Sequence, residues 1–374
     1  MRIGIFAYRQ WPFISANTDI AYLVGEHLKA RGHEVVFVGF KQDAVQNSVE
    51  RYKNIPICFL NDSIPAGDTY LRNLFQSKAP DFITYHNIAK ELRKIVNTES
   101  LELLICMTAP NWDIDIVVTA KLHIPVLLYQ LDPYYNSHDI VSRPLKKKFS
   151  KILDYVRWIF TTQLLYEEYL RDEEICTFKN KMSVLEFPKL TKTMCEGKVL
   201  NNRPRLLYAG SLYQDIRSPQ ILIDLRNCLS ARYDVVFCGE CDAEGMMEQL
   251  RKVGVICKGY CDKSTLADEV ERADILINIG NKVKNQLGSK IVDYISTGKP
   301  IFDIVQFEDC PTKRVLEKYP YWFCINADDL KNQKVEVDSV VDCLIGKCAK
   351  WEDIQKEYRR FTPEFVVDEI EKHF

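Results

Sequence analysis

The chain has 374 residues, 47% of them hydrophobic and 27% charged, which is the composition of a globular protein and excludes a disordered one. Its length exceeds what one hydrophobic core ordinarily organises and predicts two domains. Because 50 Lys and Arg residues nearly balance 52 Asp and Glu residues, no excess of positive charge draws the chain to a polyanion, so we expect no nucleic-acid partner.

The first half alternates short apolar segments with segments of helical periodicity. A predicted helix over 19–30 lies between predicted strands over 3–8 and 34–38. Further strands are predicted at 103–107, 126–130 and 158–161. This alternation predicts a parallel sheet that is covered by helices on both faces.

The second half repeats this pattern. Strands are predicted at 205–210, 235–238, 255–258, 275–279 and 300–305. The polar, proline-containing segment 190–203 between the two series predicts a linker. We therefore expect a Rossmann-like domain over 1–190, a second Rossmann-like domain over 204–350, and a helical tail over 351–374 that packs back on the first domain.

The segment 285–301 carries the strongest functional signal. Gly288 and Ser289 stand where a helix is expected to begin, so its N–H groups would face an anion, and Lys290 adds a positive charge. Asp293 follows on the same helical face, where its carboxylate would accept hydrogen bonds from a ribose diol. Phosphate and ribose recognition together predict a nucleotide site. The alternative is that Ser289 only caps the helix and that Lys290 and Asp293 form an exposed ion pair.

A second element borders the same predicted site. Gly210 ends the first strand of the second series, and Arg217 follows in the loop before the next helix. Ligands of doubly wound sheets collect at the carboxyl ends of strands, so this loop and the Lys290 helix are expected to line one crevice. There Gly210, Ser289 and Lys290 would surround a diphosphate and Arg217 would pair with it. Alternatively, Arg217 simply faces solvent.

The segments 285–301 and 206–225 resemble the donor site of retaining GT-B glycosyltransferases, of the family 4 or group 1 type. The resemblance implies an α/β GT-B architecture, in which two Rossmann-like, doubly wound domains face a central cleft. It further implies that Arg217 and Lys290 bind the donor diphosphate, that Asp293 binds the ribose, and that Tyr260 contacts the nucleobase.

The chain departs from this family at one important position. Many members carry two glutamates eight residues apart, where this sequence has Asn285 and Asp293. Aspartate still suits ribose, but Asn285 carries no negative charge and cannot act as a base. Asn285 therefore remains a candidate for the catalytic position without a carboxylate's chemistry.

The acceptor side gives a weaker signal. Asp132 follows the strand predicted at 126–130, which places it where an acceptor contact or a catalytic carboxylate is expected. The same Asp-Pro pair is also an ordinary turn opener. Further along, Lys146, Lys147, Lys148 and Lys151 lie on a predicted amphipathic helix. This helix favours peripheral contact with an anionic membrane, or else its charged side is simply solvated.

Other features predict the compartment. Residues 2–7 have the pattern of a buried strand rather than of a signal peptide, and no segment reaches the roughly 20 apolar residues that cross a bilayer. The 13 scattered cysteines are typical of a reducing compartment. We expect a cytoplasmic protein, with a peripheral position at the inner face of the membrane if the basic helix binds lipid.

The sequence as a whole thus predicts a glycosyltransferase with an acceptor domain over 1–190 and a donor domain over 204–350. It would move a sugar from a UDP- or GDP-sugar to a glycan or lipid-linked acceptor, with no cofactor and no metal, in surface polysaccharide synthesis. The alternatives are a sugar-nucleotide epimerase of the same architecture and a non-catalytic sugar- or nucleotide-binding protein.

Overall fold

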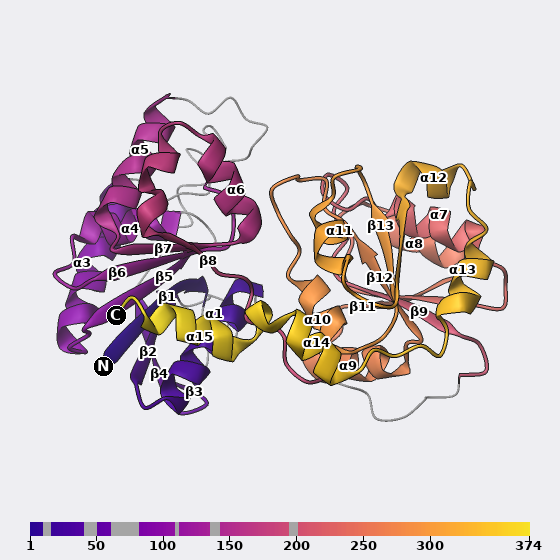
Figure 1. The fold of residues 1–374 in the computed structure, drawn as a ribbon, viewed down its shortest axis with the longest axis horizontal. Coiled ribbons are helices and arrows are strands. Elements are labelled where there is room, and N and C mark those ends of the chain that lie inside the picture. The colour runs from indigo at the N-terminus through magenta and orange to yellow at the C-terminus, as the bar shows by residue number, and fades with distance from the viewer. Residues whose placement is uncertain (10–15, 41–50, 61–81, 109–111, 135–142, 194–200) are drawn as a thin grey trace. The chain divides into compact units, whose positions relative to one another are not determined.

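The computed structural model describes residues 1–9, 16–40, 51–60, 82–108, 112–134, 143–193 and 201–374. The chain divides into two compact units, which Figure 1 shows as ribbons. One unit is formed by Met1–Lys189 together with Arg360–Phe374, and the other by Leu190–Arg359. Among the described residues, no helix is both long and apolar enough to cross a membrane.

The N-terminal unit contains an eight-stranded sheet in the order β3-β4-β2-β1-β5-β6-β7-β8. Its strands are β1 (Arg2–Arg9), β2 (Glu34–Phe40), β3 (Arg51–Tyr52), β4 (Ile55–Leu60), β5 (Leu103–Thr108), β6 (Val126–Gln130), β7 (Trp158–Thr161) and β8 (Met182–Val184). Its helices are α1 (Ala16–Ala30), α3 (Phe82–Thr98), α4 (Trp112–Ala120), α5 (Arg143–Tyr155), α6 (Gln163–Arg171) and α15 (Pro363–Glu371), with 3₁₀ turns at Ile175–Lys181 and Arg359–Phe361. All pairs are parallel except β3 with β4.

Both faces of this sheet are buried because helices cover each of them. On one face, alternate residues of β5 and β6 pack with α3, α4 and α5 in one hydrophobic cluster. On the other face, α1 lies so close to β2 that a Cβ on Gly25 would come within 2.5 Å of Phe37. This two-sided burial explains why the strands are almost wholly apolar.

The helix α15 completes the N-terminal unit, although it follows the whole C-terminal unit in sequence. It lies beside α1 (Figure 1). Arg31, just after α1, forms ion pairs with Asp368 at 2.5 Å and Glu371 at 2.7 Å. His373 stacks on Trp158 of β7, with 3.8 Å between ring centroids. The segment 351–374 is therefore divided, because its first helix belongs to the C-terminal unit.

The C-terminal unit contains a six-stranded, wholly parallel sheet in the order β11-β10-β9-β12-β13-β14. Its strands are β9 (Arg205–Ala209), β10 (Asp234–Cys238), β11 (Val255–Gly259), β12 (Ile275–Ile279), β13 (Ile301–Val305) and β14 (Trp322–Asn326). Its helices are α7 (Gln220–Cys228), α8 (Met246–Lys252), α9 (Lys263–Arg272), α10 (Lys290–Ser296), α11 (Pro311–Leu316), α12 (Ala327–Lys331), α13 (Val337–Leu344) and α14 (Trp351–Glu357).

The two sheets confirm the predicted class, an α/β chain with two Rossmann-like, doubly wound sheets. In the C-terminal unit the chain moves outward from β9 to β11, then returns to pair β12 with the other side of β9. Such a switch point opens a crevice at the carboxyl ends of the two strands, where ligands of this fold class bind. The loops after β9 and β12 are thus the first place to look for a site.

Candidate functional site

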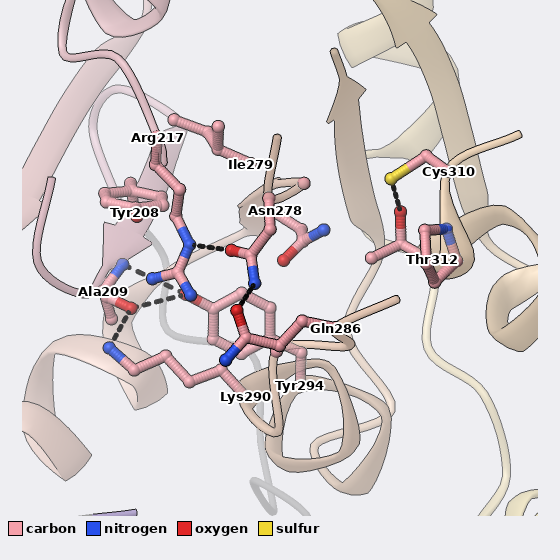
Figure 2. A pocket seen from close by; sticks show the side chains of 14 residues that line it. Tyr208, Ala209, Arg217, Asn278, Ile279, Gln286, Lys290, Tyr294, Cys310 and Thr312 are labelled. Carbon is pink, nitrogen blue, oxygen red and sulfur yellow. Dashed lines mark hydrogen bonds between the residues drawn. The ribbon is translucent and has the colours of Figure 1, made fainter. Parts of the chain in front are cut away.

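A pocket lies at this switch point, and Figure 2 shows the side chains that line it. It is formed by Tyr208, Ala209, Arg217, Asn278, Ile279, Gly280, Asn281, Gln286, Gly288, Lys290, Tyr294, Cys310, Pro311 and Thr312. Two of these described lining residues, Arg217 and Lys290, are cationic, and none is acidic. The pocket therefore suits an anion.

Arg217 is held at one side of the pocket by an amide chain. Its Nε donates a hydrogen bond to Asn281 Oδ1 at 2.6 Å, and Asn281 Nδ2 in turn donates to Gln286 Oε1 at 3.4 Å. The guanidinium also interacts with the hydroxyl of Tyr208, where it opposes the rise in pKa that burial causes. A guanidinium fixed through Nε keeps its terminal nitrogens in a defined plane, as bidentate phosphate recognition requires.

Lys290, the first residue of α10, reaches across to the end of β9. Its Nζ donates to the backbone oxygen of Ala209 at 2.8 Å. Tyr294, one turn along α10, accepts a hydrogen bond from Ala209 N at 3.0 Å and donates to Ala209 O at 3.2 Å. A Cβ on Gly210 would lie 2.5 Å from Lys290 Nζ, so the ammonium group would have to shift, and the φ of +155° at this position also favours glycine.

A larger cavity of about 630 Å³ adjoins the cationic pocket within the same unit. Leu266 and Val270 of α9 form an apolar wall, and Asp293 of α10 contributes a carboxylate. Ala209, Lys290 and Tyr294 line both cavities, so the ammonium group of Lys290 stands where the two meet. A cavity with an apolar wall and the carboxylates of Asp293 and Glu271 thus opens beside a cationic pocket.

The other predicted donor residues lie at varying distances from this centre. Ser289 precedes α10 but makes no capping hydrogen bond with its side chain, and α10 has only seven residues. The two cationic side chains, rather than the helix terminus, therefore make this pocket suited to an anion. Tyr260 is 78% exposed, and neither cavity includes it among its described lining residues. Asn285 is buried beside the pocket without lining it.

Sequence reasoning missed a buried network behind the pocket. Asp303 of β13 accepts hydrogen bonds from Asn278 Nδ2 at 2.7 Å and from Thr312 Oγ1 at 2.9 Å. Thr312 Oγ1 lies 3.3 Å from Cys310 Sγ. Burial raises the pKa of Asp303 to about 6. The signal was present, because Asn278 and Asp303 are the polar residues that interrupt two otherwise apolar strands.

The acceptor candidate Asp132 belongs to the other unit and follows β6. Near it, the strands β5, β6 and β7 end in Thr108, Gln130 and Thr161, which pair side by side in register. These three side chains are buried, and no hydrogen-bond partner from the described residues reaches the Thr oxygens or the Gln130 amide. Sequence reasoning missed this row, although a polar residue ends each apolar strand.

Two lysines of the basic helix α5 form ion pairs with aspartates of the same unit. Lys146 forms an ion pair with Asp172 at 2.6 Å, and Lys148 forms one with Asp115 at 2.6 Å. Burial raises the pKa of the Asp115 carboxyl, and the neighbouring Lys148 opposes that rise. Lys147 and Lys151 remain the basic residues on which membrane contact would depend.

The sequence matches no protein-family model and no curated protein. Solved structures nevertheless share its fold along the whole chain. A sucrose-phosphate synthase from Thermosynechococcus elongatus has a TM-score of 0.70 at 14% identity, covering 99% of this chain and 97% of that one. The α,α-trehalose-phosphate synthase (UDP-forming) from Burkholderia xenovorans, solved with glucose-6-phosphate, has a TM-score of 0.71 at 11% identity, covering 100% and 99%. Anabaena HepE, solved with UDP-glucose, has a TM-score of 0.67 at 12% identity, covering 100% and 98%.

These neighbours are GT-B proteins, and the similarity confirms the predicted GT-B fold. It extends through both units, so it includes the switch point at which the cationic pocket lies. At such low identity the likeness shows the fold, and the chemistry must be argued from the site.

Proposed function

We propose that this chain is a glycosyltransferase that binds a nucleotide diphosphate sugar in its C-terminal unit and passes the sugar to a glycan or lipid-linked acceptor. One observation carries the proposal: a pocket with two cations and no acidic lining residue among those described adjoins a larger cavity that has an apolar wall and the carboxylate of Asp293. The cations suit a diphosphate, and the apolar wall with its carboxylate suits a nucleoside. The two cavities adjoin, as the diphosphate and the nucleoside do in a nucleotide.

The diphosphate would lie between Arg217 and Lys290. Negative charge grows on the diphosphate as its bond to the sugar breaks, and two fixed cations stabilise that charge more than they stabilise the ground state. This supports a transfer that needs no metal ion, and we propose retention of configuration with it. Gly210 serves the same group, because its missing Cβ admits Lys290.

The nucleoside would occupy the larger cavity. The carboxylate of Asp293 would accept hydrogen bonds from the ribose hydroxyls, and the apolar side chains of α9 would pack against the base. HepE has been solved with UDP and with UDP-glucose, so uridine is the first base to test. We retain Tyr260 as a proposed base contact and Ser289 as a proposed phosphate contact.

The remaining details of the proposal concern the acceptor and the cellular role. Asp132 and Asn285 stay proposed catalytic positions, and surface polysaccharide synthesis at the inner face of a membrane stays the proposed role.

An epimerase would need acids or bases around the sugar, yet none of the described residues that line the cationic pocket is a carboxylate or a histidine. This observation favours transfer over epimerisation.

A thermal-shift panel tests the proposal. UDP, GDP, ADP and their sugar conjugates are added to the wild type, to Lys290→Ala and to Lys334→Ala, a matched control whose lysine pairs with Asp329 on the surface. We expect one nucleotide to raise the melting temperature of the wild type and the control but not of Lys290→Ala. No stabilisation by any nucleotide would favour a non-catalytic protein, for which Asn285 is the best argument.

A further inference from the structure

A buried carboxylate lies directly behind the proposed donor pocket. Asp303 is fully buried, at 0% exposure, and does not itself line the pocket. In the parallel register it stands beside Asn278 of β12 on one side and Cys324 of β14 on the other. Its two oxygens bind two residues that do line the pocket, Asn278 and Thr312. Any effect of Asp303 on a ligand must therefore act through these two side chains.

The carboxylate fixes which way both groups point. An ionised carboxylate only accepts hydrogen bonds, so Asn278 must turn its Nδ2 toward Asp303, and its Oδ1 then remains as an acceptor. No donor from the described part of the chain is paired with that Oδ1. Thr312 likewise commits its hydroxyl hydrogen to Asp303, which leaves only lone pairs for other partners.

We propose that Asp303 is a positioning residue that holds Asn278 and Thr312 so that the pocket recognises the hydroxyl or amide hydrogens of the donor sugar. The inference rests on the proposed function and deepens it. Arg217 and Lys290 lie at one side of the pocket, and Thr312 and Cys310 at the other (Figure 2). Arg217 and Lys290 would bind the diphosphate, and Asn278 and Thr312, which Asp303 positions, would bind the sugar.

Protonation of Asp303 reverses this arrangement. A neutral carboxyl group donates one hydrogen bond, so either Asn278 or Thr312 loses its acceptor and is free to turn. Burial raises the pKa of Asp303 to about 6, and the titratable groups that face it are Lys313, Cys310 and Cys324. Recognition of the sugar should therefore be complete above pH 7 and weaken as the pH falls through 6.

Calorimetry on the full chain separates the sugar from the nucleotide. Dissociation constants are measured for UDP, UDP-glucose, UDP-galactose, UDP-N-acetylglucosamine, GDP and GDP-mannose, with the wild type and with Asp303→Asn. We define the extra affinity as the ratio of the dissociation constant of the free nucleotide to that of its sugar conjugate. We expect Asp303→Asn to bind the free nucleotide within about twofold of the wild type. Its extra affinity should fall about tenfold, which is the value of one good hydrogen bond. In the Asn278→Ala background, Asp303→Asn should add little.

Glu269→Gln is the matched control, because Glu269 is a buried carboxylate of the same unit that pairs with Arg205 and Lys258 instead. It should lower the melting temperature without changing the extra affinity for the conjugate. If Asp303→Asn does not fold, the pH dependence of the wild type gives the same answer. Equal losses for nucleotide and conjugate, unchanged extra affinity, or a conjugate that binds the wild type no tighter than the nucleotide would overturn the inference. A wild type that binds no nucleotide would overturn the proposed function itself.

Discussion

The two sheets of this chain differ in the polar groups at the carboxyl ends of their strands, which we call the carboxyl edge of each sheet. In the C-terminal unit, the polar groups at this edge are paired: Arg217 with Asn281, Lys290 with Ala209, and Asp303 with Asn278 and Thr312. In the N-terminal unit, the row formed by Thr108, Gln130 and Thr161 is buried and has no hydrogen-bond partner within the described part of the chain. The same fold thus presents one polar edge whose groups are paired, the organised edge, and one whose groups have no partner among the described residues.

The difference has a free-energy consequence. A buried polar group without a partner costs about 1–3 kcal/mol, whereas paired groups roughly recover their loss of hydration. The organised edge holds its geometry before any ligand arrives, which is what electrostatic stabilisation of a leaving group demands. Without partners, the row of the N-terminal unit should lower the stability of its own unit.

The largest effect should come from removing the charge of the organised edge. Arg217→Ala and Lys290→Ala should each weaken nucleotide diphosphate binding by roughly 10- to 100-fold, since each removes a charged hydrogen-bond donor worth about 1.5–3 kcal/mol. Calorimetry gives the dissociation constants, with Lys334→Ala as the control. If both variants bind like the wild type, the pocket is not the anion site and the contrast between the edges has no functional meaning.

A smaller effect should follow from filling the space beside Lys290. Gly210→Ala places a Cβ 2.5 Å from Lys290 Nζ, so the ammonium group must move and nucleotide affinity should fall by about tenfold. Lys334→Ala, whose lysine pairs with Asp329 on the surface, again serves as the control. Similar affinities for the two variants would show that the position of Lys290 does not matter.

The row of the N-terminal unit should respond in the opposite direction. Thr161→Val keeps the shape of the side chain and removes an unpaired hydroxyl, so it should raise the free energy of unfolding by about 1 kcal/mol. Denaturant titration measures this change, and Thr312→Val, which breaks a bond to Asp303, should destabilise the chain by a similar amount. Loss of stability in Thr161→Val would mean that its hydroxyl is paired after all, and the comparison would fail.

The smallest effect should come from removing metal ions. In the proposed function Arg217 and Lys290 would supply the positive charge that a metal ion supplies elsewhere, so EDTA should leave the rate of nucleotide release from a donor sugar within about twofold. Steady-state assays with and without EDTA measure this rate. A large loss that added Mg²⁺ or Mn²⁺ restores would contradict metal independence.

Local pattern was sufficient for most of the fold. The predicted strands 126–130, 158–161 and 275–279 coincide with β6, β7 and β12, because a short apolar segment between polar segments is typical of a buried strand. The strands β3, β4, β8 and β14 were missed. Residues of β14 are only half-buried for most of its length, as expected at the edge of a sheet, so its pattern is weaker.

The site could be predicted only where it lies within one segment. Lys290 and Asp293 occur in a short motif, and Arg217 follows a strand, so their roles could be inferred from neighbours in sequence. Asn278 and Asp303 meet because β12 and β13 pair in register, and Thr108 meets Thr161 only across β6. Such contacts depend on the order of the strands in the sheet, which a single sequence does not reveal.

The position of α15 bears on how the chain is made. The ribosome synthesises residues in order, so the N-terminal unit waits for α15 until the whole C-terminal unit has been translated. Until then, Arg31, His33 and Trp158 lack the partners that residues 368–373 provide. The sheet of the N-terminal unit is complete in sequence at β8, so this unit can begin to fold early, but it reaches its full stability only after α15 has been made. Removal of residues 363–374 should therefore make the N-terminal unit more sensitive to protease than the C-terminal unit.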